Sequence, residues 1–198
     1  MNKLILDLCG GTGSWSRPYR EAGGYDVHLV TLPDGDVRKY VPPPNVYGIL
    51  AAPPCTMFSF CRTNAKVMRD LEGGMSIVNA CLEVIWKTQY QPISNTAKYT
   101  RLKFWALENP YFGLLKNFIG KPSYVFDPYE FGDGYKKRTA LWGNFTEPKK
   151  GKYDCKTAKF DRLLTREIHA EWYGKHDRAT RRAITPQGFA KAFFEANP

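Results

Sequence analysis

Three apolar runs in the first 110 residues each lead directly into a short segment of chemically distinctive residues. The runs cover residues 4–6, 48–52 and 104–107, and each has the length of a single strand. The segments that follow them are Asp7 to Trp15, Pro53-Pro54-Cys55 and Glu108-Asn109-Pro110. In an open α/β sheet, the loops that leave the carboxyl ends of parallel strands converge on one crevice. The sequence therefore predicts that a glycine-rich turn, a thiol and a carboxylate meet at one site.

The rest of the chain alternates between strand-like and helix-like stretches. Further strands are predicted over residues 27–32, 124–126 and 139–142. Helices are predicted over residues 14–22, 67–89, 112–119 and 163–173, with a last helix that begins at Thr185 and Pro186. This alternation favours an α/β fold with a mostly parallel sheet and helices on both faces. Neither a repeat nor a domain boundary is visible, so residues 1–198 are predicted to form one domain.

Composition limits the classes of protein to which the chain can belong. Hydrophobic residues make up 43% of it, enough for a folded core. No apolar stretch approaches the roughly 20 residues of a membrane-spanning helix, and the N-terminus lacks the pattern of a secretion signal. The five cysteines are scattered and share no zinc-ligand spacing with the three histidines. We therefore expect a cytoplasmic protein with reduced thiols, no metal and no membrane partner.

Positive charge is concentrated in the C-terminal third. The whole chain carries a formal charge of +10, and residues 136–198 hold 15 Lys and Arg against 7 Asp and Glu. Aromatic residues are interspersed through the same stretch. Basic side chains neutralise phosphates, and flat rings stack on exposed bases. A solvated basic surface would give the same pattern, so charge alone leaves these two interpretations equal.

Each of the three segments allows a functional and a structural interpretation. Glycines before a helix let the backbone approach an anionic ligand, but a tight turn without a ligand needs them too. The prolines before Cys55 would project its thiol from a strand end, whereas Cys9, Cys61, Cys81 and Cys155 are better explained as structural cysteines. Desolvation of Glu108 would raise its pKa and suit a proton donor, and a capping or salt-bridged carboxylate is the alternative.

The three segments, in this order, resemble the cytosine-C5 DNA methyltransferase family. In that family the prolyl-cysteine supplies the nucleophile, and the Glu-Asn dipeptide supplies the acid that holds the base. Residues 136–143 resemble the family's arginine motif, and residues 182–190 resemble its closing segment. The resemblance implies a Rossmann-like, class I S-adenosyl-L-methionine-dependent methyltransferase. It also implies that Cys55, Glu108 and Arg138 are catalytic, with Arg138 donating to the cytosine O2.

The resemblance further implies which residues bind the cofactor and the DNA. S-adenosylmethionine would contact Asp7, Leu8, Cys9, Gly10, Gly11, Thr12, Gly13, Ser14, Trp15, Thr31, Asp36 and Pro53. DNA would contact Ser59, Lys137, Lys149, Lys150 and Lys152. Ser59 belongs to a polar segment, residues 56–66, that is predicted to form a mobile loop over the site. The chain departs from the family at Cys9, where an aromatic residue is usual, and at Thr31, where an acidic residue is usual.

The chain is short compared with the larger members of that family. Where those carry a separate recognition domain, this chain has only a basic insertion, residues 144–182, which predicts loose sequence specificity. Compact forms of this kind resemble viral or mobile-element enzymes, which act in the host cell cytoplasm. We expect a monomer. Two alternatives stay open: methylation of RNA or of a pyrimidine nucleotide, and a catalytically inert nucleic-acid-binding module.

Overall fold

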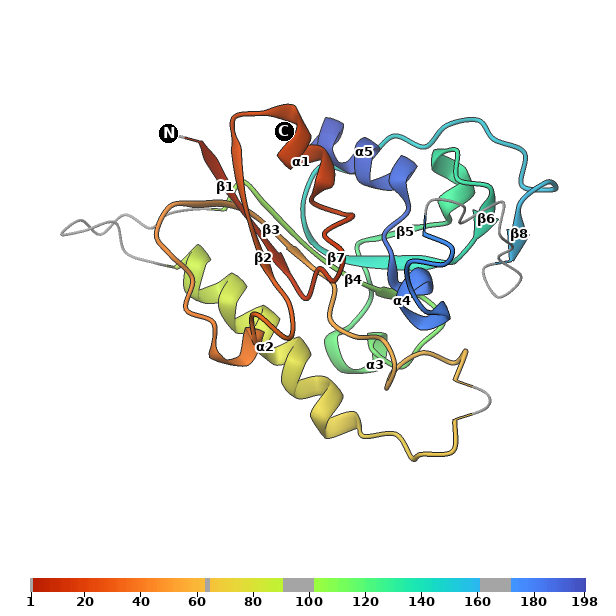
Figure 1. Ribbon diagram of the computed structural model, residues 1–198, viewed down its shortest axis with the longest axis horizontal. Helices are drawn as coiled ribbons and strands as arrows, with labels where there is room; N and C mark the ends of the chain where they lie inside the picture. The colour runs from red at the N-terminus through yellow and green to blue at the C-terminus, as the bar shows by residue number, and fades with distance from the viewer. Residues whose placement is uncertain (1, 63–64, 91–101, 161–171) are drawn as a thin grey trace.

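A six-stranded mixed sheet with the order β2-β1-β3-β4-β7-β5 forms the centre of the molecule (Figure 1). The computed structural model describes residues 2–62, 65–90, 102–160 and 172–198. The strands of this sheet are β1 (Lys3–Leu8), β2 (Tyr25–Val30), β3 (Val46–Ala51), β4 (Phe104–Pro110), β5 (Tyr124–Phe126) and β7 (Thr139–Asn144). The predicted parallel α/β sheet is confirmed for β2-β1-β3-β4, whereas β7 runs antiparallel to both of its neighbours.

Helices cover both faces of the sheet. α1 (Arg17–Ala22) and α5 (Gln187–Ala196) lie together on one face, and α2 (Leu71–Gln89) lies with the 3-10 helix η1 (Val37–Lys39) on the other (Figure 1). The remaining elements are α3 (Lys116–Ile119), η2 (Pro128–Phe131), α4 (Arg178–Ala183) and the paired strands β6 (Tyr135–Lys136) and β8 (Lys159–Phe160). Within the described residues, no helix combines the length and apolarity needed to cross a membrane.

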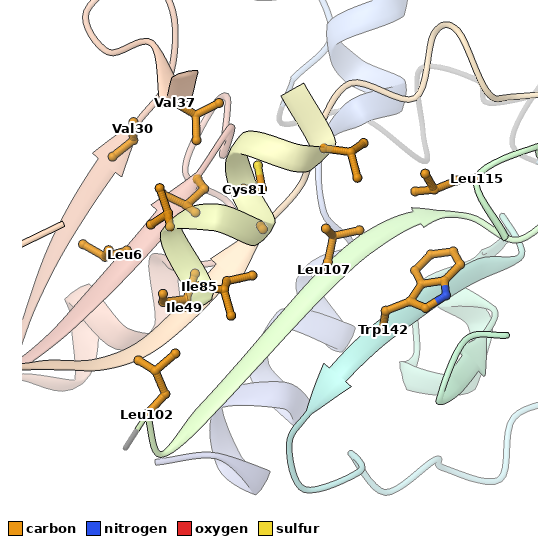
Figure 2. Packing of buried hydrophobic residues seen from close by; sticks show 14 of the residues in the cluster. Leu6, Val30, Val37, Ile49, Cys81, Ile85, Leu102, Leu107, Leu115 and Trp142 are labelled. Atoms are coloured by element: carbon orange, nitrogen blue, oxygen red, sulfur yellow. The ribbon is translucent and has the colours of Figure 1, made fainter. Parts of the chain in front are cut away.

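Successive residues of the central strands point to opposite faces of the sheet, and both faces are apolar. On the face of α1 and α5, Ile5 and Leu50 pack with Trp15 and Phe193. On the other face, the strands pack against one side of α2 in a cluster that includes Leu6, Ile49, Leu107, Cys81 and Ile85 (Figure 2). Because both faces are covered, the strands occur in the sequence as continuous apolar runs.

Helices α1, α2 and α3 begin later than the sequence predicts; α3 begins at Lys116 instead of residue 112. α1 begins at Arg17, because residues 9–16 are used for the glycine-rich turn. α2 begins at Leu71, directly after Asp70, whose Oδ1 accepts a hydrogen bond from the Gly73 backbone N–H at 2.8 Å. A carboxylate that accepts from a first-turn N–H satisfies one of the unpaired donors of the helix and so defines where it begins.

The start of α5 is set by a residue far away in the sequence. The helix begins at Gln187, and its N-terminal Gly188 N–H donates to Asp133 Oδ2 at 3.1 Å instead of to the predicted cap, Thr185. Burial raises the pKa of Asp133 to about 6. The helix predicted over residues 163–173 lies almost wholly outside the described residues.

The order of the strands fixes where a ligand site can form. The chain passes from β1 to β2 on one side and then returns to β3 on the other side of β1. In α/β sheets, ligands bind outside the carboxyl ends of the strands at the point where the order reverses. In this molecule that point lies between β1 and β3.

Candidate functional site

The three segments meet at the carboxyl edge of the sheet, as the sequence predicts. The loops after β1 and β3 start side by side, because the Ala52 N–H donates to the Leu8 carbonyl at 2.9 Å. The end of β4 is joined to them by Asn109, whose buried Nδ2 donates to the Pro53 carbonyl at 3.0 Å. This bond joins the Glu108-Asn109-Pro110 segment directly to the Pro53-Pro54-Cys55 segment.

Cys55 lies half-buried at the start of a tight turn. Its carbonyl accepts hydrogen bonds from the backbone N–H groups of Phe58, at 3.0 Å, and Ser59, at 2.8 Å. Burial raises the pKa of the Cys55 thiol, and the charge of Glu108 adds to that rise. The positive charges of Lys137 and Arg182 act in the opposite direction. A thiol, a carboxyl group and two cations therefore share this edge of the sheet.

Glu108 follows the apolar part of β4 and is itself half-buried. Burial raises the pKa of its carboxyl group, and the charge of Lys137 partly offsets that rise. Near neutral pH a larger fraction of Glu108 is therefore protonated than of an exposed glutamate, so the residue can act as a hydrogen-bond donor.

Lys137, and not Arg138, is the cation beside the thiol and the carboxyl group. The ladder between β4 and β7 pairs Glu108 with Leu141. Paired residues share a face of the sheet, and side chains alternate along an extended strand, so Lys137 falls on the face of Glu108 and Arg138 on the opposite one. The Lys137 Nζ also donates to the Arg182 carbonyl at 2.6 Å, which holds the end of α4 at the site.

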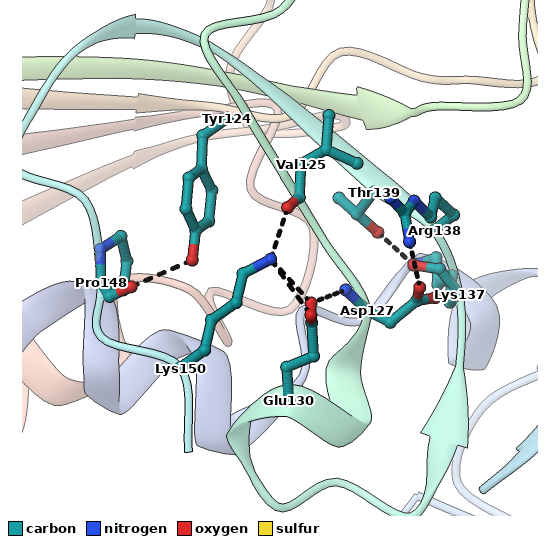
Figure 3. Close-up of polar contacts among 9 residues, drawn as sticks. All are labelled: Tyr124, Val125, Asp127, Glu130, Lys137, Arg138, Thr139, Pro148 and Lys150. Atoms are coloured by element: carbon teal, nitrogen blue, oxygen red, sulfur yellow. Dashed lines mark hydrogen bonds and ion pairs between the residues drawn. The ribbon is translucent and has the colours of Figure 1, made fainter. Parts of the chain in front are cut away.

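Arg138 points toward a different set of residues (Figure 3). Its Nη1 lies 3.2 Å from Asp127 Oδ2, and its guanidinium lies 5.8 Å from the centroid of the Tyr111 ring. The family resemblance implies that Arg138 lies with Cys55 and Glu108. The structure does not bring Arg138 together with these two residues. Side chains that alternate in direction along residues 136–143 place Lys137 and Arg138 on opposite faces. The sequence does not show which of the two faces the site until the register with β4 is known.

The turn after β1 has the backbone of a ligand-binding loop. Gly11 and Gly13 adopt positive φ angles of 56° and 68°, and so does Cys9 at 56°. Gly10 has no room for a Cβ, which would overlap the carboxylate of Asp7. Gly11 faces open space, since a Cβ there would have no atom within 4 Å. The turn is thus tightly folded on the inside and open on the outside.

Asp7 lies directly under this turn and is fully buried. Its Oδ2 accepts a hydrogen bond of 2.5 Å from the Ser16 hydroxyl, whereas its Oδ1 has no hydrogen-bond partner among the described residues. Burial raises the pKa of Asp7 to about 6. An unpaired oxygen of this kind suits a donor group on a ligand.

Several residues predicted to bind a cofactor take part in packing or in local hydrogen bonds. Trp15 is buried between α1 and α5, with its ring 5.4 Å from that of Phe193, and Leu8 is buried on the other face. The Cys9 sulfur lies 3.9 Å from that of Cys81 in α2. The hydroxyls of Thr12 and Ser14 are hydrogen-bonded to each other at 2.7 Å. Of this turn, Gly10, Gly11 and Thr12 have the most accessible positions.

The segment after β2 is shaped by a local ion pair. Asp36 accepts two charge-assisted hydrogen bonds from Arg38, at 2.9 Å from Nε and 2.7 Å from Nη2, and one from the Arg38 backbone N–H at 3.0 Å. The side-chain bond to Arg38 is the main reason that the pKa of Asp36 falls to about 2. The Thr31 carbonyl accepts from the Gly35 N–H at 2.8 Å. The carboxylate predicted to meet the adenine is thus already paired with a guanidinium.

The loop predicted to cover the site is held in place where the structure describes it, at residues 56–62. Its backbone pairs with the segment after β4 through hydrogen bonds from Phe60 N–H to the Phe112 carbonyl, at 3.2 Å, and from Leu114 N–H to the Phe58 carbonyl, at 3.0 Å. The Arg69 guanidinium donates to the carbonyls of Met57 and Ser59 on the other side, at 2.6 and 2.9 Å. Ser59 therefore sits in a clamped turn beside the site.

The three lysines of the basic insertion that were predicted to bind DNA differ in their surroundings. Lys150 donates to the Val125 carbonyl at 2.9 Å and pairs with Glu130 at 3.0 Å (Figure 3). Lys149 and Lys152 are exposed. Among the described residues, no group of three or more His, Cys, Asp and Glu is placed to hold a metal ion.

A scan against protein-family models and a search of curated protein sequences found no match to this chain. The chemistry of the site must therefore carry any functional assignment.

Proposed function

We propose that this protein transfers a methyl group from S-adenosylmethionine to C5 of cytosine in DNA, through a covalent bond between Cys55 and C6 of the base. The observation that carries the proposal is the placement of Cys55 beside Glu108, fixed by the hydrogen bond from Asn109 to Pro53. The order of the motifs along the chain, which resembles that of the cytosine-C5 methyltransferases, supports the same assignment.

The crevice between β1 and β3 is the proposed cofactor site. Its turn suits the amino-acid end of S-adenosylmethionine, because the open backbone at Gly11 permits close approach. The fit at the adenosine end is weaker, since Asp36 is paired with Arg38. When bound, this cofactor supplies an electrophilic methyl group on sulfur.

Cys55 and Glu108 would activate the base together. The Cys55 thiolate adds to C6 and forms a carbon–sulfur bond, and the displaced electron pair is stabilised by a hydrogen bond or proton from Glu108 at N3. C5 becomes nucleophilic and takes up the methyl group. Loss of the C5 proton to a base and breakage of the bond between Cys55 and C6 restore the aromatic ring and the thiolate.

The electrostatics of the pair suit these two roles. The charge of Glu108 raises the pKa of Cys55, so protonation of Glu108 removes that effect and favours the thiolate. Lys137 lowers the pKa of both groups and would stabilise the negative charge that passes between them. The active form therefore has a protonated Glu108 and an ionised Cys55, and turnover should show a maximum between two pKa values.

DNA is the proposed partner because of the positive charge of the chain. The chain has a formal charge of +10, and Lys149 and Lys152 are exposed. Such side chains neutralise phosphates. Because C5 and C6 of a paired cytosine are covered by its stacked neighbours, the target base has to leave the duplex or start in a single strand.

The test is the transfer of a labelled methyl group from S-adenosylmethionine to DNA, RNA and cytidine nucleotides, each offered alone. We expect label in DNA, and none in DNA with Cys55→Ala protein. Label found only in RNA or in nucleotides would show that these, and not DNA, are the substrate. Binding of nucleic acid without any transfer would replace the proposal with an inert binding module.

A further inference from the structure

Two exposed aromatic residues occupy facing positions in two paired segments, one after Cys55 and one after Glu108. Phe60 follows Cys55 by five residues, and Phe112 follows Glu108 by four. Their segments form a short antiparallel bridge between Ser59 and Gly113, in which the Phe60 N–H donates to the Phe112 carbonyl. Residues that face each other across such a bridge hold their side chains close together. Phe60 is 51% exposed and Phe112 is 58% exposed.

Packing and hydrogen bonds around this bridge hold it in place. Phe58 is completely buried and packs against Phe118 of α3, with ring centroids 6.2 Å apart. Arg69 donates to the carbonyls of Met57 and Ser59. Gly113 permits the close approach of the two segments, because a Cβ at this position would lie 3.1 Å from the Phe58 carbonyl oxygen. The two exposed rings therefore sit on a preorganised support and need little ordering on binding.

Two cations lie close to Tyr111, the aromatic neighbour of Phe112. The Phe112 ring lies 5.3 Å from that of Tyr111, measured between centroids. Lys116 Nζ lies 4.7 Å from the Tyr111 centroid, and the Arg138 guanidinium lies 5.8 Å from it. Asp127, which pairs with Arg138, is almost entirely buried, whereas the Arg138 side chain is 47% exposed. Flat rings next to accessible cations form the combination that binds bases and phosphates of a single strand.

We propose that Phe60 and Phe112 form a stacking platform for an unpaired base adjacent to the target cytosine. This inference rests on the proposed function and narrows its substrate: the protein binds cytosine in a strand whose neighbouring bases are unstacked, in preference to a fully paired duplex or a free nucleotide. Stacking on aromatic rings accepts every base, which matches a chain that lacks room for a large recognition domain.

The test compares the variant Phe60→Leu/Phe112→Leu with the natural protein in binding to a short cytosine-containing single strand. Leucine keeps apolar bulk at both positions and removes the flat ring. We expect the variant to lose about tenfold or more in affinity. A 2-aminopurine placed next to the cytosine should be quenched by the natural protein and not by the variant.

Two controls separate stacking from charge and from general damage. Tyr90→Leu removes an aromatic residue that is 62% exposed at the C-terminal end of α2, away from the bridge, and should leave affinity unchanged (Figure 1). Heparin, a polyanion without bases, should bind the natural protein and the double variant equally. An equal loss for heparin and for the strand would overturn the platform, because charge would then explain both.

The platform and the proposed function can fail separately. If the double variant binds the single strand as tightly as the natural protein, the platform is wrong, whether or not methyl transfer occurs. If the variant loses affinity and 2-aminopurine quenching but the natural protein transfers no methyl group, the platform stands and the enzyme assignment falls. If only the sedimentation coefficient changes, the rings form a contact between copies of the chain, and the platform is also wrong.

Discussion

The carboxyl edge of the sheet and the basic insertion, residues 144–182, hold their charged groups in opposite ways. At the edge, charged groups are wholly or partly buried. Hydrogen bonds from side chains to backbone carbonyls fix the geometry: Asn109 donates to Pro53, and Lys137 donates to Arg182. In the described part of the insertion, most basic side chains are exposed. Bond formation needs atoms placed to within a fraction of an ångström, whereas attraction to phosphate needs only charge nearby. We therefore expect the two regions to respond differently to substitution, pH and salt.

The largest difference is expected between two cysteines. Cys55→Ala should lower turnover by at least about 1,000-fold, because Cys55 is the nucleophile proposed to add to C6. Cys61→Ala should leave turnover within about twofold, since Cys61 is an exposed thiol beyond the clamped turn. Single-turnover assays with labelled S-adenosylmethionine measure both. Similar losses in the two variants would mean that the edge has no special nucleophile.

A pH effect on stability is expected from Asp7 at the edge and not from the lysines of the insertion. The pKa of Asp7 rises from 3.8 to about 6 in the folded protein. A carboxyl group with a raised folded-state pKa stabilises the fold below its unfolded pKa, and this stability is lost as the pH rises through about 6. In Asp7→Asn, the unfolding free energy should fall with rising pH by on the order of 3 kcal/mol less than in the natural protein, since one unit of pKa corresponds to about 1.4 kcal/mol.

Urea unfolding between pH 4 and pH 7 measures this difference between natural protein and variant. Lys149→Ala is the matched control from the insertion and should leave the pH dependence of unfolding unchanged. Parallel curves for the natural protein and Asp7→Asn would show that Asp7 titrates normally.

Lys137 and Arg138 are adjacent in the sequence, but their substitution should change different properties. Lys137→Ala should lower turnover about 10- to 100-fold and shift the pH optimum upward, because its charge lowers the pKa of both Cys55 and Glu108. Lys137→Arg should restore part of the activity. Arg138→Ala should affect nucleic-acid affinity more than the pH profile, because Arg138 faces Asp127. A pH shift in Arg138→Ala but not in Lys137→Ala would reverse the two assignments.

The smallest effects are expected within the insertion itself. Lys149→Ala/Lys152→Ala should reduce the slope of log affinity for DNA against log salt by up to about 1.8, if both side chains contact phosphate. Lys150→Ala should cost no more than about 1 kcal/mol in unfolding free energy, because its ion pair with Glu130 is partly exposed. Salt titrations and thermal unfolding distinguish the two behaviours. An unchanged slope would assign Lys149 and Lys152 to solvated surface.

The fold and the meeting of the three segments were predictable because they follow from local patterns. Buried parallel strands give continuous apolar runs, and their carboxyl ends have to share one edge. Cys55 and Glu108 could therefore be placed near each other without any knowledge of their contacts.

The remaining details depend on pairings between distant residues. Which of Lys137 and Arg138 faces the site is fixed by the register between β4 and β7. The start of α5 depends on Asp133, more than 50 residues earlier in the chain. The burial of Trp15 against Phe193 likewise joins the two ends of the sequence. The pairing of Asp36 with Arg38 and the capping of α2 by Asp70 are, by contrast, local enough to have been predicted from the sequence.

Covalent capture of the substrate tests the central claim most directly. DNA that contains 5-fluorocytosine cannot lose its C5 substituent after methyl transfer, so the bond to the attacking thiol persists. With S-adenosylmethionine present, we expect a denaturant-resistant adduct whose mass equals protein plus oligonucleotide plus one methyl group minus the proton that the thiol loses, and whose cross-linked peptide contains Cys55. Cys61→Ala should form the same adduct, and Cys55→Ala should form none. An adduct formed by Cys55→Ala, or none with the natural protein while methyl transfer proceeds, would contradict the account.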